Sequence, residues 1–334
     1  MSNNPLKRKK NFMKRSRRSI LVLIVITLFV LVLGPFLIPL PPLHDTVLPE
    51  QLADPDSKFV TIRNVDVHYK MEGKGDDILV FLHGFGASTF TWHKVSKPLS
   101  QNYTVIAYDR TGFGYTSRPM PGEWSGESPY SQESQVEQLI ALMDTLKVDK
   151  TVLIGNSAGG VTATLATLKY PERVKALILV GAAIFKGGPP DWLNPFMRIP
   201  QVKRVGPLLL REYYKNFFEK ARKFIWHDPS KQTPEILEGY RKPMRAHNWD
   251  RALWEYALAY NSSNPGEKLG GIKVPVLVIT GDDDRIVPPE ASEKIADEIS
   301  HAELVVISNS GHLPQEETPE EFLEVVNNFL EEVL

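Results

Sequence analysis

Short strand-like segments alternate with helix-like segments along most of this chain, and this alternation limits the folds that the chain can adopt. Several strand-like segments are almost entirely apolar, as strands covered on both faces are. The order strand, helix, strand predicts an α/β fold with a mostly parallel sheet and helices on both sides. The predicted strands are residues 59–62, 65–69, 78–82, 103–108, 151–154, 176–180, 274–280 and 304–307. The clearest predicted helices are residues 131–146, 158–169, 291–299 and 319–334.

The alternation stops between residues 185 and 264, where no buried-strand run occurs. This segment contains 14 of the 32 aromatic residues in under a quarter of the chain. We expect a helical insertion here, which we call the cap. Most of its aromatic side chains are expected to form a small core of their own, and the others to line an apolar pocket that faces the sheet. The predicted α/β core then consists of two parts, residues 58–184 and 265–334.

The N-terminus combines a basic cluster with a long apolar run. Residues 1–18 include eight basic side chains and no acidic one, and every residue from Ile20 to Leu33 except Thr27 is apolar. The run resumes to Leu40, and a helix over residues 20–40 would span about 31 Å, close to the ~30 Å hydrocarbon thickness of a bilayer. We therefore predict a basic tail over residues 1–18, a transmembrane signal anchor over residues 19–40 and a stiff, proline-rich stalk over residues 41–57.

Two alternatives to the anchor remain. A cleaved secretory signal has the same basic start and apolar middle, but it needs small residues at a cleavage site, and residues 33–43 offer only Gly34 among prolines and large side chains. A peripheral or soluble form is the other. If the anchor is retained, the positive-inside rule predicts a single-pass membrane protein with a cytoplasmic N-terminus and an extracytoplasmic body.

Charge and composition argue against several classes of function. The chain has no cysteine, which excludes a thiol nucleophile, a disulfide and a Cys-type zinc site. Without the basic tail it has 31 basic residues against 40 acidic ones, so a nucleic acid is not an expected partner. We find no cluster of metal ligands and no phosphate-binding loop, and we expect neither a metal nor a cofactor. The oligomeric state stays open.

A short glycine-rich motif indicates a nucleophile. The segment Gly155-Asn156-Ser157-Ala158-Gly159 matches Gly-x-Ser-x-Gly, follows a predicted strand and precedes a predicted helix. In that setting a sharp turn raises the serine hydroxyl above the sheet edge, and the flanking residues are small because the backbone packs closely. Ser157 is therefore the predicted nucleophile. The alternative is a glycine-rich turn with an idle serine.

A serine hydroxyl needs a base to remove its proton and a third group to orient that base. Three carboxylates, Asp282, Asp283 and Asp284, follow the predicted strand 274–280, and His312 follows the predicted strand 304–307. Both groups lie at the carboxyl ends of strands, where open α/β sheets bind ligands. The chain order Ser, Asp, His agrees with a hydrolase arrangement.

Residues 59–334 resemble the α/β-hydrolase-fold serine hydrolases. The resemblance implies that His312 is the base and that Asp284 orients it, with Asp283 as the alternative acid. It also implies that the backbone N–H groups of Phe85 and Ala158 form the oxyanion hole. His83 and the loop after the fourth strand are expected to be structural. The matching segments are His83-Gly84-Phe85-Gly86, Asp109-Arg110-Thr111-Gly112-Phe113-Gly114, Gly155-Asn156-Ser157-Ala158-Gly159, Asp284-Arg285-Ile286-Val287-Pro288 and Gly311-His312.

This resemblance implies hydrolysis through an acyl-enzyme on Ser157. We expect a carboxylic-ester hydrolase with a small apolar substrate, such as a monoacylglycerol-like lipid, because the anchor places the site near a bilayer and the cap is aromatic. Relatives that open epoxides or cleave carbon–halogen bonds have Asp at the position of Ser157, in the turn called the nucleophile elbow. The serine of this chain therefore argues against both reactions. Meta-cleavage carbon–carbon hydrolases share the elbow but usually have Gly-Pro-Gly where this chain has Gly84-Phe85-Gly86. A carbon–carbon hydrolase, amide hydrolysis or perhydrolysis, and a non-catalytic ligand receptor on the same scaffold remain as alternatives.

Overall fold

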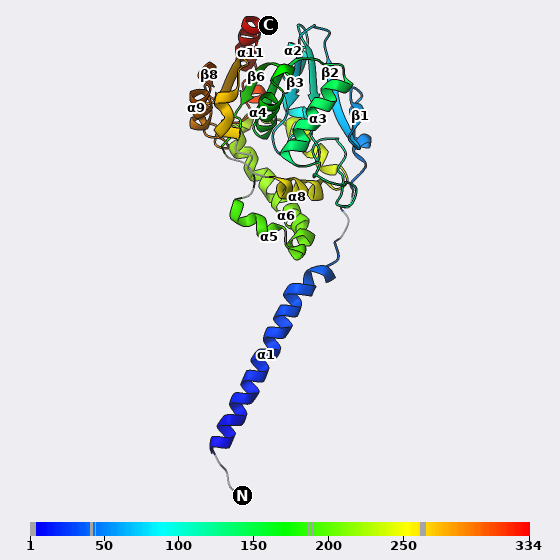
Figure 1. Cartoon of the computed structure of the whole chain (residues 1–334), viewed down its shortest axis with the longest axis vertical. Coiled ribbons are helices and arrows are strands. Elements are labelled where there is room, and N and C mark those ends of the chain that lie inside the picture. Colours follow the sequence, from blue (N-terminus) through cyan, green and yellow to red (C-terminus); the bar gives the residue numbers. More distant parts are fainter. Residues whose placement is uncertain (1–4, 41–42, 44, 186–187, 189, 261–264) are drawn as a thin grey trace.

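The computed structural model of the chain contains one eight-stranded, mostly parallel sheet (Figure 1). It describes all residues except 1–4, 41–42, 44, 186–187, 189 and 261–264. The strand order is β1-β2-β4-β3-β5-β6-β7-β8, with β1–β2 and β2–β4 antiparallel and the other neighbouring pairs parallel. This confirms the predicted fold class and all eight predicted strands. Their bounds are β1 Lys58–Ile62, β2 Val65–Glu72, β3 Ile78–Leu82, β4 Thr104–Tyr108, β5 Thr151–Asn156, β6 Val174–Val180, β7 Val276–Gly281 and β8 Ala302–Ile307.

Helices cover both faces of the sheet, and the strand side chains alternate between the two layers. In β3, Val80 and Leu82 belong to the apolar layer under α3 and α4, whereas Leu79 and Phe81 belong to the layer under α11. This alternation explains why the central strands are apolar at every position. The helices concerned are α2 Ser96–Leu99, α3 Gln132–Thr145, α4 Ala158–Lys169, α9 Pro289–Glu298, α10 Pro314–Glu317 and α11 Pro319–Val333.

Between β6 and β7 the described residues form helices and no strand, as predicted for the cap. Helix α8 packs Trp249 and Tyr256 against Phe113 and Tyr130 of the core, while Trp254 packs with Met197 of α5. The aromatic side chains of the cap therefore form small clusters of their own, one of which includes the core loops. The cap elements are η4 Asp191–Leu193, α5 Asn194–Met197, α6 Pro200–Ile225, η5 Pro229–Lys231, α7 Pro234–Arg241, η6 Lys242–Arg245 and α8 Trp249–Ala259, followed by η7 Pro265–Gly271.

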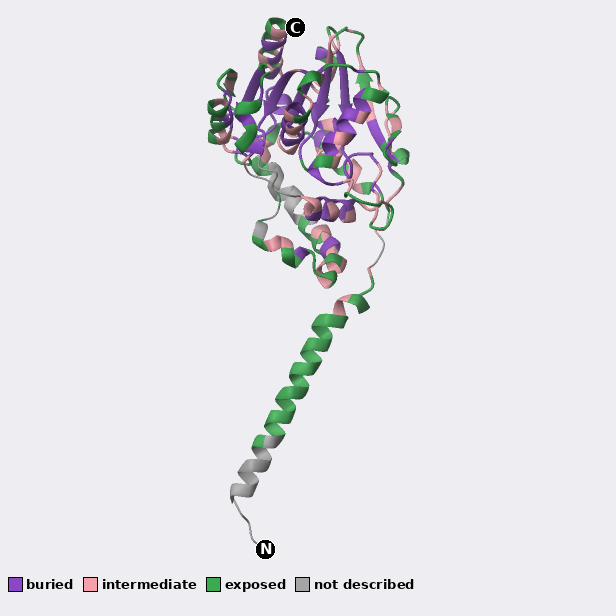
Figure 2. Cartoon of the chain, viewed as in Figure 1, coloured by how far each residue is buried: buried purple, intermediate pink, exposed green. Residues whose placement is uncertain are grey.

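One long N-terminal helix, α1 Pro5–Leu37, extends away from the body, with the chain's C-terminus at the opposite end of the molecule (Figure 1). Its segment Arg15–Leu37 is long and apolar enough to cross a membrane, a property that signal sequences share, and it is exposed except at Gly34 and Pro35 (Figure 2). The helix ends before Leu40, the predicted end. Pro39 explains the difference, because a proline disfavours helical conformation at the preceding residue.

The segment predicted as a stalk is attached to the body. The backbone N–H of Val47 donates to the carbonyl of Arg245 (2.9 Å), and the N–H of His247 donates to the carbonyl of Val47 (2.9 Å). Asp54 pairs with Lys242 of the cap and with Lys70 of β2. These contacts connect the end of α1 to both the cap and the sheet.

Candidate active site

Ser157 occupies the sharp turn between β5 and α4, the turn that the motif predicts. Its φ of 52° and ψ of −119° are a strained backbone conformation for a residue with a side chain. An added Cβ at Gly155 would lie 2.6 Å from the Cα of Gly160, and one at Gly159 would lie 2.2 Å from the carbonyl oxygen of Leu82. Both glycines are therefore required by close backbone packing, which keeps the serine at the top of the turn.

His312 and Asp284 form a buried pair at the ends of two neighbouring strands. His312 Nδ1 lies 2.7 Å from Asp284 Oδ2, and the two residues are 6% and 3% exposed. The other carboxylate oxygen, Oδ1, accepts hydrogen bonds from the backbone N–H groups of Ile286 (2.9 Å) and Val287 (2.8 Å). This fixed carboxylate favours the tautomer with the proton on Nδ1, which leaves Nε2 of His312 free to act as a base.

The other two carboxylates of the three-Asp run lie elsewhere. Asp283 pairs with Arg285 and with Nδ1 of His227 (2.9 Å) on the surface of the cap junction. Asp282 accepts a hydrogen bond from the backbone N–H of Ser310 (3.2 Å), which joins the two loops of the site. Of the candidate acids, the structure thus brings Asp284 to the histidine.

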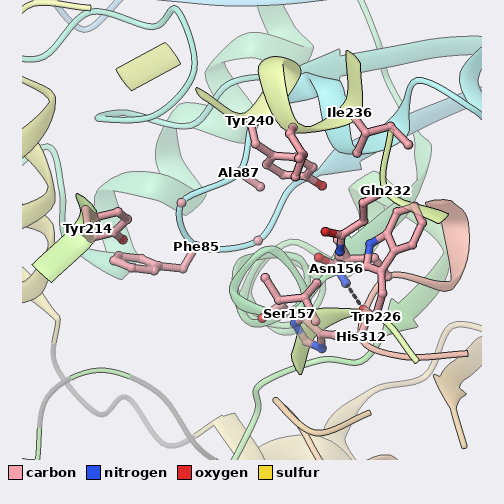
Figure 3. Close-up of a pocket in the computed structure, with 15 residues that line it drawn as sticks. Phe85, Ala87, Asn156, Ser157, Tyr214, Trp226, Gln232, Ile236, Tyr240 and His312 are labelled. Atoms are coloured by element: carbon pink, nitrogen blue, oxygen red, sulfur yellow. Dashed lines mark hydrogen bonds between the residues drawn. The ribbon is translucent and has the colours of Figure 1, made fainter. Parts of the chain in front are cut away.

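Ser157 and His312 line the same cavity, of about 150 Å³ (Figure 3). The side-chain amide of Asn156 fixes their relative position, because its Nδ2 donates to the carbonyl of Val180 (3.1 Å) and to that of His312 (3.3 Å). Gly181 has a φ of +49°, and an added Cβ there would lie 3.0 Å from Asp284 Oδ2 and 3.1 Å from His312 Nδ1. The sequence did not predict the positioning role of Asn156 or the close packing at Gly181. The only signal for Asn156 was its place inside the motif.

The two predicted oxyanion-hole donors belong to the segments on either side of Ser157. An added Cβ at Gly84 would lie 3.2 Å from the Cβ of Ser157, so the loop that carries Phe85 passes beside the serine. Ala158 is the first residue of α4, and the first N–H groups of a helix have no partner within it. A helix N-terminus also favours a developing negative charge.

His83 supports this loop, as expected. It is fully buried, its Nδ1 lies 2.7 Å from the carbonyl oxygen of Gly84, and its Nε2 accepts the backbone N–H of Arg110 (3.1 Å). Burial and the nearby guanidinium of Arg110 lower the pKa of His83 to about 3, so the ring is neutral. With both nitrogens engaged, His83 shapes the loop and has no proton-transfer partner at the serine.

Asp109, which begins the loop after β4, is also structural. Its buried carboxylate accepts hydrogen bonds from the backbone N–H groups of Thr89 (2.6 Å) and Tyr115 (2.7 Å) and lies 2.7 Å from Nδ1 of His68. Burial opposes ionisation, but the bonds from His68 and Tyr115 outweigh it and lower the pKa of Asp109 to about 2. The ionised carboxylate therefore ties three segments together beside the site.

Two acidic residues after His312 connect the site to the cap, and sequence reasoning did not find them. The carboxylate of Glu317 accepts the backbone N–H groups of Gly311 (2.8 Å), His227 (2.8 Å) and Asp228 (2.7 Å). Glu316 is fully buried and accepts the hydroxyl of Tyr240 at 2.6 Å, and burial raises the pKa of Glu316 to about 8. The loop that carries His312 is thus bonded directly to the cap.

The cavity beside Ser157 is apolar, and its walls come from both core and cap. A second cavity, of about 350 Å³, shares Phe85 and Ser157 with the first. No Lys, Arg, Asp or Glu is among the described residues that line either cavity. Such walls suit an uncharged, apolar ligand. The apolar and aromatic residues lining the first cavity are Phe85, Ala87, Tyr214, Ile225, Trp226, Ile236, Leu237, Tyr240 and Leu313.

Comparisons with known proteins agree on the fold, and the relatives are named for different substrates or activities. The family model of the α/β hydrolase fold matches residues 77–319. A 2-hydroxy-6-oxononadienedioate/2-hydroxy-6-oxononatrienedioate hydrolase of Paraburkholderia xenovorans is 30% identical over 285 residues, which cover 82% of this chain and 95% of the relative. Among solved structures, the N-acyl homoserine lactone degrading enzyme Est816 is 27% identical with a TM-score of 0.65, covering 81% of this chain and all of that one. A thermophilic esterase of Thermogutta terrifontis is 25% identical with a TM-score of 0.69, and the match covers 83% of this chain and 98% of that one.

Proposed function

The chain belongs to the α/β-hydrolase family, and from this premise we propose that it is a membrane-anchored serine hydrolase that cleaves a carboxylic ester with an uncharged, apolar acyl group. One observation carries the proposal. Ser157 and the paired His312 line an apolar cavity with no charged side chain among its described lining residues. An ester or a lactone of an apolar acid is the substrate class that such a cavity binds most readily.

In the proposed reaction, Oγ of Ser157 attacks the acyl carbon while Nε2 of His312 takes the hydroxyl proton. The tetrahedral oxyanion accepts hydrogen bonds from the N–H groups of Phe85 and Ala158, each worth roughly 3 to 4 kcal/mol. His312 then gives its proton to the leaving alcohol, and the acyl group stays on the serine. A water molecule, deprotonated by His312, releases the acid and restores the serine. Asp284 stabilises the imidazolium in both steps.

A carbon–carbon hydrolase is the second candidate, because the relative from Paraburkholderia xenovorans is named for that class of substrate and because the elbow reads Gly-Asn-Ser-Ala-Gly-Gly. A dienedioate bears two carboxylates, and burial of a carboxylate without a cation or several donors is strongly unfavourable. Neither cavity at Ser157 has a Lys or Arg among its described lining residues. This argues for the ester.

A panel of p-nitrophenyl esters tests the proposal, with Ser157→Ala as the control and a 2-hydroxy-6-oxodienoate as the competing substrate. We expect turnover of neutral esters, loss of that turnover in Ser157→Ala, and slower cleavage of the dienoate. Faster cleavage of the dienoate would replace the ester hydrolase by a carbon–carbon hydrolase. An ester turnover that Ser157→Ala leaves unchanged would refute the mechanism. Ligand binding without any turnover by the wild type would favour the receptor.

The proposed location is a single membrane span through α1, with the N-terminus in the cytoplasm and the catalytic body on the extracytoplasmic side. The apolar, exposed segment Arg15–Leu37 supports the span, and the basic residues that precede it support the orientation. N-terminal sequencing of membrane-extracted protein tests it against a cleaved signal. A chain that begins after residue 33 would contradict the anchor.

A further inference from the structure

The first turns of cap helix α6 contact the last turns of α1. Nε2 of Gln201 donates to the carbonyl of Val32 (3.2 Å). The guanidinium of Arg204 donates through Nε to the carbonyl of Pro35 (3.1 Å) and through Nη2 to that of Ile38 (3.2 Å). The carbonyl of Pro35 has no partner within α1, because the residue four positions later is a proline without an N–H. Arg204 therefore replaces a missing helical hydrogen bond.

These contacts fix the depth of the cap relative to the apolar helix. Val32 lies inside the predicted span of residues 20–40 and Ile38 lies near its end. At ~1.5 Å rise per residue, the two carbonyls are about 9 Å apart along the helix axis. The polar layer on one side of a bilayer is roughly 5 to 8 Å thick. If α1 crosses the membrane over residues 20–40, Ile38 lies about 3 Å and Val32 about 12 Å inside the end of the hydrocarbon. The start of α6 therefore extends from the boundary with this polar layer into the outer part of the hydrocarbon.

The residues just before α6 expose large apolar side chains at this level. Trp192, Phe196 and Ile199 are 70%, 55% and 40% exposed, whereas Met197 packs into a small core with Trp254. The segment thus has a buried side, which attaches it to the cap, and an exposed apolar side. Figures 1 and 2 show α5 and α6 at the end of the body nearest to α1. Exposed aromatic side chains beside an apolar span are typical of the membrane interface.

We propose that residues 192–204 form a membrane-docking surface whose partner is the boundary between headgroups and acyl chains of the bilayer that α1 spans. This inference rests on the proposed anchor. It also deepens the proposed function, because α6 continues from the docking surface to the catalytic cavity, where Tyr214 and Ile225 form part of the wall. The cap would thus take an apolar ester directly from the lipid layer.

The chain has no cysteine, so single cysteines can be introduced and labelled with a nitrobenzoxadiazole fluorophore without further changes. Phe196→Cys reports on the docking surface, and Trp192→Cys repeats the measurement in case the first variant folds poorly. Leu28→Cys reports on the span, and Leu334→Cys, at the opposite end of the molecule, is the matched control (Figure 1). Each full-length variant is reconstituted into phosphatidylcholine vesicles that contain a lipid with a spin label on its acyl chain close to the headgroup.

We expect the labels at residues 192, 196 and 28 to lose emission to the spin-labelled lipid, and the label at residue 334 to keep it. Quenching by the lipid at residue 28 but not at 192 or 196 would refute the docking surface and still support the anchor. Absence of quenching at all three residues, 28, 192 and 196, would refute both the anchor and the docking surface. Protection of residues 192 and 196 from aqueous iodide without quenching by the lipid would show that a second copy of the chain covers this face, and would overturn the proposal.

Discussion

Replacement of Gly181 by alanine should slow catalysis measurably while the protein stays folded. The added methyl would lie 3.0 Å from Asp284 Oδ2 and 3.1 Å from His312 Nδ1, closer than an ordinary carbon contact. Neither neighbour moves freely. The carboxylate of Asp284 is held by two backbone N–H groups, and the backbone N–H of His312 donates to the carbonyl of Ile225 at 2.7 Å. The methyl must therefore displace the imidazole or the carboxylate by a few tenths of an ångström.

The magnitudes follow from this crowding. A misplacement of about 1 Å in a catalytic group lowers the rate about 100-fold, so a displacement of a few tenths of an ångström should lower the turnover of Gly181→Ala by roughly 4- to 10-fold. The positive φ of +49° is unfavourable for alanine by roughly 1 to 2 kcal/mol, and the lower entropy of the unfolded chain offsets about 0.4 to 1 kcal/mol of it. The expected loss in the free energy of unfolding is thus only about 1 kcal/mol.

The matched control is Gly126→Ala. Gly126 also has a positive φ, of +81°, but an added Cβ there meets no atom within 4 Å. It should lower the free energy of unfolding by a similar amount and leave turnover of a p-nitrophenyl ester unchanged. Urea denaturation and kcat measured on the same preparations separate the two effects. Full activity in Gly181→Ala, or an equal loss of activity in Gly126→Ala, would refute the reasoning.

Four further substitutions test the site and its surroundings. Asp284→Asn should lower kcat by several orders of magnitude, whereas Asp283→Asn should leave it within about twofold; equal losses in ester turnover would contradict the assignment. Burial raises the pKa of Glu316 from 4.5 to about 8, so the folded state holds a proton there that the unfolded chain releases. The free energy of unfolding should then fall between about pH 5 and pH 8, and Glu316→Gln, which still accepts the Tyr240 hydroxyl, should flatten this slope in urea denaturation. Glu317→Gln replaces a carboxylate that accepts three backbone N–H groups, and it should lower kcat at least severalfold with little change in KM. An unchanged kcat would show that the hydrogen bonds between the cap and the histidine loop do not position the base.

Local sequence patterns predicted the fold well, because they depend on which residues are buried. The predicted strand 78–82 and the predicted helix 158–169 match β3 and α4 residue for residue. The end of α1 was predicted at Leu40 and lies at Leu37, because the count of apolar residues ignored the effect of Pro39 on the residue before it. The basic tail also continues the helix back to Pro5, which no apolar pattern could have indicated.

The candidate site was predictable only in part, because several of its contacts join residues far apart in the sequence. The family resemblance selected Asp284 from the run of three aspartates but left Asp283 as an alternative, and the position of His312 in space separates the two. Asn156 contacts the backbone of His312 across 156 residues. Gln201 contacts Val32 across 169 residues. Neither periodicity nor motif spacing reports on such contacts.

Covalent labelling with a fluorophosphonate tests the central claim most directly, because the probe reacts only with a serine whose proton is removed by a neighbouring base. The full-length chain should be modified once, on the peptide that contains Ser157, at a rate that falls sharply in His312→Ala and with no labelling in Ser157→Ala. An unlabelled wild-type chain, or labelling as fast in His312→Ala as in the wild type, would contradict the account.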